Sequence, residues 1–108
     1  MPDAQSVSAR FGAAVPATAV AGRLVLAMAA RTTLDIDAVD EFVMAVDLAL
    51  ATCPPGEVRL EARVVETGLE VVVAPVSPER LANREPLLAS LVDRVELRGE
   101  EVALRAGI

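Results

Sequence analysis

The sequence contains no histidine, lysine, tryptophan or tyrosine, and its only aromatic residues are Phe11 and Phe42. These absences exclude an imidazole base or phosphoacceptor, a histidine metal ligand, a Schiff-base lysine and a P-loop lysine. The single cysteine, Cys53, has no partner for an internal disulfide and no histidine to activate its thiol. We therefore expect Cys53 to be a small hydrophobic residue at a helix end.

Positive charge is also scarce. The ten cationic residues are all arginines, and sixteen acidic residues bring the net charge to −6. Nucleic acid requires a clustered basic surface, which the scattered arginines do not supply, so no nucleic-acid partner is expected. An acidic surface instead suits solubility or a basic protein partner.

No long hydrophobic run is uninterrupted. Residues 13–30 are largely apolar, but Pro16, Gly22 and Arg23 fall among them, which argues against a membrane span. The first residues carry Asp3 before any positive charge and lack the basic region that begins an export signal. The sequence therefore predicts a cytoplasmic protein with no membrane partner.

The residues that are present suit one globular domain, residues 1–108. Hydrophobic residues make up 54% of the chain and charged residues 24%, a balance typical of a folded protein with a modest core. Hydrophobic periodicity and turn residues predict eight elements. In chain order they are a strand at 6–14, helices at 17–31 and from Asp35 or Asp37 to Leu50, strands at 57–65 and 69–74, a helix at 83–92, and strands at 95–97 and 102–104.

This order, βααββαββ, predicts an α/β (α+β) two-layer sandwich, with helices on one face of a mainly antiparallel sheet. In the first hairpin, Glu66-Thr67-Gly68 is expected to form the turn, with the glycine at positive φ. In the second helix, five residues at helical spacing are expected to face the core: Ile36, Val39, Val43, Val46 and Leu50.

Four carboxylates stand in the stretch LDIDAVDE, residues 34–41. Acidic side chains stabilise the start of a helix because they accept hydrogen bonds from free N–H groups and face the positive end of the helix dipole. A Mg²⁺ or Ca²⁺ site would need more oxygen ligands, at looped spacing. We therefore favour a capped helix start over a cation site, and no metal is expected.

Two runs carry a resemblance to a known family: VPATAVAGRLVLAMAARTTLDIDAVDEFVMAVDLA at 15–49 and PLLASLVDRVELRGEEVALR at 86–105. They resemble the opening and closing parts of the GHKL (Bergerat-fold, histidine-kinase-like) ATPase domain of small bacterial anti-sigma factors that are also serine kinases. The resemblance covers nearly the whole chain and depends on hydrophobic pattern and on short words such as MAVD. It implies a GHKL-like fold, homodimerisation, and partners of the sigma or STAS type.

The family's nucleotide motifs are absent from this sequence. Alignment on Ala45-Val46-Asp47 places Leu48 at the family's glutamate and Thr52 at its Mg²⁺-binding asparagine, and neither side chain replaces those functions. The other lost positions are Ala74 or Pro75 at the adenine-binding aspartate, and Ala82 and Arg84 in the glycine-rich phosphate turn. The resemblance therefore implies a degenerate domain without catalytic residues and without a bound cofactor.

In the family, one face of the second helix looks into the nucleotide pocket. Glu41, Ala45, Leu48 and Thr52 would form that face here. Our hypothesis is that this face has been closed over or contacts a protein, with Leu48 simply packing beneath a shortened loop as the other interpretation. Four arginines are further candidates for contact with an acidic partner, or for a plain solvated surface: Arg23, Arg31, Arg80 and Arg84.

The expected function is a regulatory protein-binding module, similar to an anti-sigma factor. Two alternatives stay open: an ATP- and Mg²⁺-dependent serine/threonine kinase acting on a STAS-domain partner, and a structural or oligomerisation module of a signalling assembly. Small residues at helical spacing in the first helix could form a dimer seam or could pack within the monomer; they are Ala17, Ala21, Gly22 and Val25.

Overall fold

The computed structural model describes residues 6–12, 17–66 and 68–107. Its elements, in chain order, are β1 (Ser6–Phe11), α1 (Ala17–Ala29), α2 (Ile36–Leu50), β2 (Val58–Val65), β3 (Gly68–Ala74), α3 (Pro78–Leu91), β4 (Arg94–Arg98) and β5 (Glu101–Ala106). The predicted α+β class and antiparallel sheet are confirmed. Every pair of neighbouring strands is antiparallel, in the spatial order β1-β2-β3-β5-β4.

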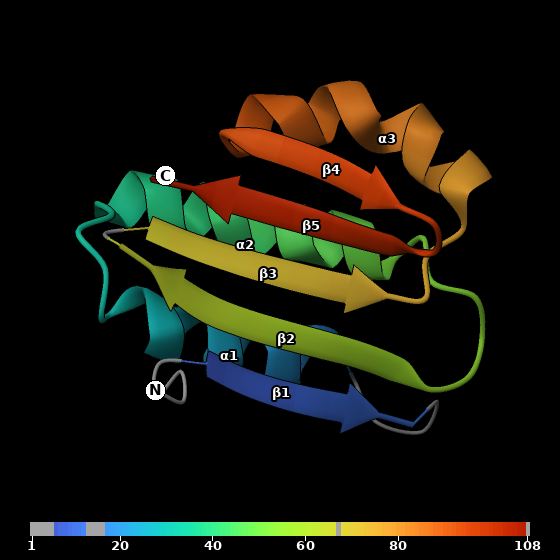
Figure 1. The fold of residues 1–108 in the computed structure, drawn as a ribbon, viewed down its shortest axis with the longest axis horizontal. Coiled ribbons are helices and arrows are strands. Elements are labelled where there is room, and N and C mark those ends of the chain that lie inside the picture. Colours follow the sequence, from blue (N-terminus) through green and yellow to red (C-terminus); the bar gives the residue numbers. More distant parts are fainter. Residues whose placement is uncertain (1–5, 13–16, 67, 108) are drawn as a thin grey trace.

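The helices lie behind the sheet when its open face is toward the viewer (Figure 1). Helix α1 packs on β2 and β3, α2 packs on β3 and β5, and α3 packs on α2 and β4. The strands alternate as the sequence predicts, because successive side chains of a strand point to opposite faces. In β2, for example, Val58, Leu60, Ala62 and Val64 are buried beneath the helices.

Two turns hold the strand pairs in register. Gly99 connects β4 to β5 at φ 61, a left-handed conformation that suits glycine. In the β2–β3 connection the left-handed residue is Glu66, at φ 55, whereas Gly68 is the first residue of β3. The glycine was therefore assigned to the wrong place in this turn. Thr67, also assigned to the turn, lies outside the described residues.

Helix α2 begins where the acidic stretch predicts it. Asp35 is its N-cap, with the Oδ1 atom accepting a hydrogen bond from the Ala38 N–H at 2.8 Å, so one of the carboxylates is used for capping. The first helix ends at Ala29, two residues before its predicted end. The first strand ends at Phe11, and its predicted continuation to residue 14 falls partly outside the described residues.

The predicted start of the third helix was wrong by five residues. Ser77 caps α3, its hydroxyl accepting a hydrogen bond from the Arg80 N–H at 3.4 Å, and Pro78 occupies the first turn. Proline suits this position because its missing N–H would have no partner there. The sequence favoured a loop from Pro75 to Pro78, but Pro78 opens the helix, and Pro86 lies inside it.

The predicted core stripe of α2 was partly wrong. The buried residues of this helix are Phe42, Ala45, Val46, Ala49 and Leu50. Val39 and Val43 are partly buried against the core, but Ile36 is 78% exposed. The buried side of the helix is thus rotated toward Phe42 and Ala45, because α3 covers α2 on one side and α1 covers it on the other.

No helix among the described residues is both long enough and apolar enough to span a bilayer.

Candidate functional site

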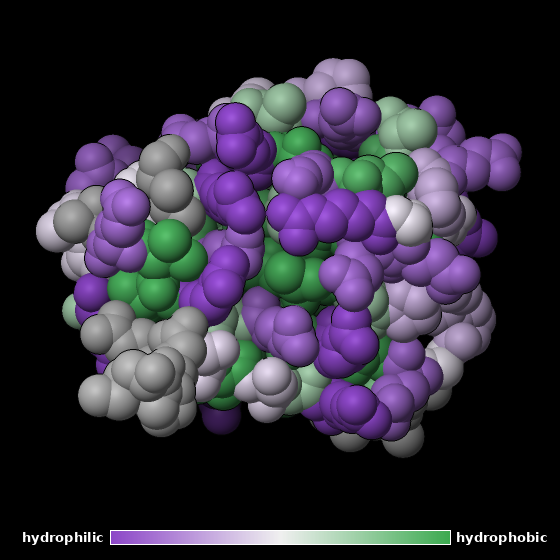
Figure 2. Space-filling model, in the orientation of Figure 1, coloured by the Kyte–Doolittle hydropathy of each residue, from purple (hydrophilic) through white to green (hydrophobic). Residues whose placement is uncertain are grey.

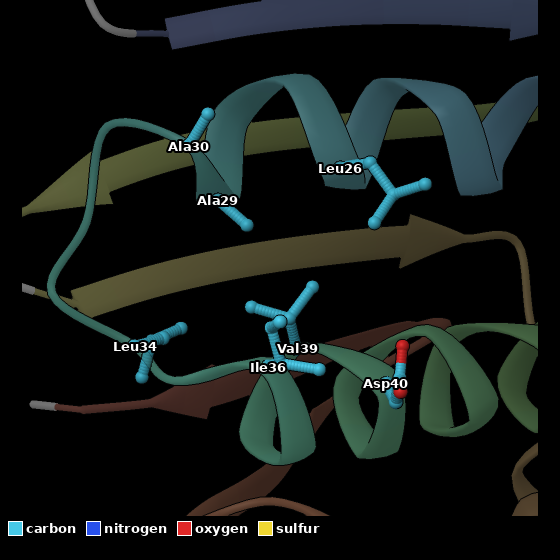
Figure 3. A pocket seen from close by; sticks show the side chains of 7 residues that line it. All are labelled: Leu26, Ala29, Ala30, Leu34, Ile36, Val39 and Asp40. Carbon is cyan, nitrogen blue, oxygen red and sulfur yellow. The ribbon is translucent and has the colours of Figure 1, made fainter.

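An apolar groove lies on the outer side of the helices, between the end of α1 and the start of α2. We call it the α1–α2 groove; its volume is about 250 Å³, and it is lined by Leu26, Ala29, Ala30, Leu34, Ile36 and Val39, with Asp40 at its rim. Figure 3 shows Leu26 and Ala29 on α1 facing Ile36 and Val39 on α2, with Leu34 on the connection between them. The groove is therefore built by a helix pair joined by a short turn.

The side chains of this groove are unusually accessible for their size and apolarity. Ile36 is 78% exposed and Leu26 is 51% exposed. Met44, farther along α2, is also largely exposed. Single exposed hydrophobic residues are ordinary, but several lining one concave surface indicate a contact site.

One acidic residue of α2 lines the same groove. Asp40 points from α2 toward the side occupied by α1 (Figure 3), and Asp37, which follows Ile36 in the chain, is exposed. Glu41 is also exposed, but it lines a different hollow, toward the end of α3. Residues 17–52 contain two arginines and five acidic residues, a net charge of −3. The surface around the groove therefore combines apolar side chains with negative charge.

The α2 face that the family resemblance assigned to a nucleotide pocket is mostly closed. Ala45 and Thr52 are fully buried, and Leu48 is partly buried against the core. The Thr52 hydroxyl donates to the Ala49 carbonyl at 2.7 Å, and the Thr52 carbonyl accepts from the Ser77 N–H at the start of α3. The expectation that Ala45 and Thr52 contact a partner is therefore wrong, because α3 packs on α2. Of the four residues proposed for this face, only Glu41 is exposed.

The other positions matched to family motifs also lie within regular structure. Ala74 is the last residue of β3 and is buried, and Pro75 follows it. Ala82 and Arg84 are exposed residues inside α3, not in a turn. Their backbone N–H groups belong to a helix interior, so this segment does not form the phosphate-binding turn that the resemblance implies for the family.

The predicted dimer seam on α1 faces inward. Ala21 and Val25 are fully buried. A Cβ atom added to Gly22 would lie 4.0 Å from Val43 Cγ1, on α2. The small residues therefore allow α1 to approach α2 and the sheet, which corrects their assignment to a subunit contact. The side chain of Ala17 lies outside the described part of the structure.

The predicted partner-contacting arginines, Arg23, Arg31, Arg80 and Arg84, are all exposed. They lie in three places: Arg23 on α1, Arg31 on the α1–α2 connection, and Arg80 and Arg84 one turn apart on α3. The larger arginine cluster, which sequence reasoning missed, lies on the open face of the sheet. It comprises Arg10, Arg59, Arg63, Arg94, Arg98 and Arg105.

On this face arginines and glutamates form pairs between and along strands. Figure 2 shows hydrophilic side chains covering most of it, with hydrophobic ones between them. Arg59 pairs with Glu101 at 2.9 Å and Arg98 with Glu96 at 2.8 Å. The face also has a polar hollow of about 400 Å³, but its two arginines, Arg63 and Arg98, are already paired with carboxylates. We assign no ligand to it.

Glu70 is the central carboxylate of the open face. Its side chain is 6% exposed and accepts hydrogen bonds from Arg63 Nη2 at 2.6 Å and Arg105 Nε at 2.5 Å. Burial alone would raise the pKa of Glu70, but the hydrogen bonds and charges of Arg105 and Arg63 outweigh it and hold the pKa below its usual value. This cluster joins β2, β3 and β5.

The two sides of the molecule therefore differ in charge. Within the five strands, the open face carries six arginines and four glutamates (Glu61, Glu70, Glu96 and Glu101), a net charge of +2. Because the whole chain carries −6, the remaining residues carry −8. Most of the negative charge lies away from the open face, including the acidic residues around the α1–α2 groove.

Asp47, which stands beside the position of the family's glutamate, is poorly accommodated. Its Oδ1 atom is buried and has no hydrogen-bond partner among the described residues. Burial raises the pKa of Asp47. The folded protein therefore binds the carboxyl proton of Asp47 more tightly than the unfolded chain does. The free energy of unfolding consequently falls as the pH rises above the unfolded pKa of about 3.9 and Asp47 ionises.

Replacing Asp47 with asparagine is expected to raise the free energy of unfolding at pH 7 by about 0.5 kcal/mol, a small figure because the side chain is partly exposed. The variant should also lose the part of the stability decline above about pH 4 that Asp47 contributes. Urea unfolding across this pH range would measure both effects. Glu41→Gln, an exposed carboxylate on the same helix, is the matched control and should change neither.

Cys53 is, as predicted, a partly buried residue packed against the core at the end of α2. Burial raises the pKa of its thiol to about 11, so the thiolate that would act as a nucleophile is scarce at neutral pH. Among the described residues, no group of three or more cysteine or acidic side chains is arranged to hold a metal ion.

Comparison with protein-family models and with curated proteins gives no match to this chain.

Proposed function

We propose that this protein is a regulatory protein-binding module, similar to an anti-sigma factor, that binds a protein partner through its helical side. The α1–α2 groove is the observation that carries this proposal. It presents exposed Ile36 and Leu26 side chains beside an acidic surface, a combination that suits a protein contact.

The proposal includes a finer assignment of the fold, as a two-layer, GHKL-like sandwich that has lost nucleotide chemistry. Two features support the loss. The sequence carries Leu48 and Thr52 where the resembling family has its catalytic glutamate and its Mg²⁺-binding asparagine. Thr52 is fully buried, with its hydroxyl already bonded to Ala49. A nucleotide at this face would require α3 to move from α2.

Titration calorimetry with Mg-ATP and Mg-ADP, up to millimolar nucleotide, tests the loss of nucleotide binding. We expect no binding heat and no rise in the melting temperature, since a bound ligand stabilises the folded state. Binding with a micromolar dissociation constant would contradict the proposal and would favour the serine/threonine kinase alternative.

The partner itself can be tested by gel filtration of the protein mixed with purified sigma-like or STAS-domain proteins. We expect a complex with one of these classes, and we expect Ile36→Asp to weaken it. Self-association without any such complex would favour a structural or oligomerisation role instead.

A further inference from the structure

We propose that the α1–α2 groove binds a cationic amphipathic helix, whose apolar side chains enter the groove while flanking lysines or arginines meet the acidic residues of α2. This inference rests on the proposed protein-binding function and specifies the chemistry of the partner. Its starting point is the conjunction of exposed apolar side chains and negative charge on one surface.

The dimensions of the groove suit side chains rather than a whole ligand. Its volume is about 250 Å³, whereas an apolar cavity of about 150 Å³ holds a benzene molecule. The groove can thus receive one or two large apolar side chains. An amphipathic helix presents such anchors at a spacing of three or four residues, and this is a common way for a helix to bind between two others.

The charges around the groove select a cationic helix. Asp40 lines the groove and Asp37 lies beside Ile36 on the first turn of α2, and neither forms an ion pair among the described residues. Asp35, by contrast, is used as the helix cap. Arg31 stands at the end of the groove formed by the α1–α2 connection, so the positive groups of the partner are expected near α2. Charge complementarity of this kind increases the association rate and selects among partners.

Two other occupants fit the charge less well. A second copy of the chain docked groove to groove would place its own Asp40 and Asp37 carboxylates against the same carboxylates. An anionic membrane would be repelled by the same carboxylates, because membrane-surface helices use lysine and arginine. The hollow on the open face of the sheet is lined mostly by polar and charged side chains, and therefore lacks the apolar anchor site.

The test uses a fluorescent synthetic peptide of 18 residues (about five helical turns) with leucine on one face and lysine on the other, measured by fluorescence anisotropy. We expect a micromolar dissociation constant that rises with salt concentration. A peptide with the same leucine face but glutamate in place of lysine should bind at least about tenfold more weakly. Equal binding of the two peptides, or no binding of the lysine peptide at millimolar protein, would overturn the inference.

The variants Ile36→Asp and Leu87→Asp locate the binding surface. Leu87 lies on α3 with 51% exposure, equal to that of Leu26, and is outside the groove. Both substitutions add one negative charge, so non-specific attraction of the peptide increases equally in both. We expect Ile36→Asp to weaken binding at least about tenfold, whereas Leu87→Asp leaves it unchanged or slightly stronger. Unchanged binding by Ile36→Asp would overturn the inference.

Circular dichroism of Ile36→Asp would verify that the variant is folded, as its exposure predicts. Sedimentation of both variants would test the second-copy alternative, since a dimer dissociated by Ile36→Asp alone would assign the groove to self-association and overturn the inference. The two proposals fail separately. Nucleotide binding contradicts the proposed function, whereas peptide binding that does not depend on Ile36 contradicts only the inference about the groove.

Discussion

Replacing Phe42 by alanine is expected to lower the free energy of unfolding by about 4 kcal/mol. Phe42 is fully buried on the core side of α2 and is one of only two aromatic residues in the chain. The remaining core is built largely from alanine, valine and leucine, which cannot extend to fill the space that a lost ring leaves. The variant therefore loses both the transfer free energy of the ring and the packing around it.

For a domain of this size such a loss corresponds to a fall in melting temperature of about 20 °C. Because typical domains are stable by only about 5–15 kcal/mol, the stability of the variant is best measured at low temperature by urea unfolding. The matched control is Met44→Ala, two residues along the same helix, where the side chain is largely exposed. That substitution should change stability by no more than about 0.5 kcal/mol. Similar losses in the two variants would mean that α2 is packed in a different rotation.

Replacing Glu70 by alanine is expected to lower the free energy of unfolding by about 2–3 kcal/mol at pH 7. Breaking a buried ion pair typically costs 3–5 kcal/mol, but the arginine side chains here are more exposed than the carboxylate, at 45% for Arg63 and 24% for Arg105. Without Glu70 these two cations lie on either side of β3, opposite position 70, with no carboxylate between them. The loss therefore includes their repulsion as well as their hydrogen bonds.

The effect of pH distinguishes this role from simple packing. The folded protein keeps the pKa of Glu70 below its usual value, so the ionised carboxylate stabilises the fold above its unfolded pKa of about 4.3. This contribution is lost as the pH falls through the lower, folded pKa. The wild-type protein and Glu70→Ala should thus become closer in stability on acidification, which urea unfolding at several pH values would show.

Glu61→Ala is the control for Glu70→Ala. Glu61 lies on the same face, in β2, but forms no ion pair among the described residues. We expect Glu61→Ala to lower the free energy of unfolding by less than about 1 kcal/mol, and we expect this loss not to shrink on acidification as that of Glu70→Ala does. Equal effects of the two substitutions would contradict a specific role for the Arg63–Glu70–Arg105 cluster.

The sequence by itself determined the local structure, because strand alternation, helix caps and turn glycines act between residues close in the chain. The alternation of β2, the Asp35 cap and the Gly99 turn were all predicted correctly. The prolines before α3 were misread because proline favours both loops and the first turn of a helix. Only the Ser77 cap hydrogen bond distinguishes the two.

Tertiary structure decided which side of each element is covered. The sequence pattern placed Ile36 in the core stripe of α2 and Ala45 on the opposite face, yet Ile36 is exposed and Ala45 fully buried, because α1, α3 and the sheet pack around α2 from distant parts of the chain. The Arg63–Glu70–Arg105 cluster likewise depends on the register of three strands. The composition showed scarce positive charge; only the folded sheet gathers most of the arginines on one face and leaves the acidic groove on the other.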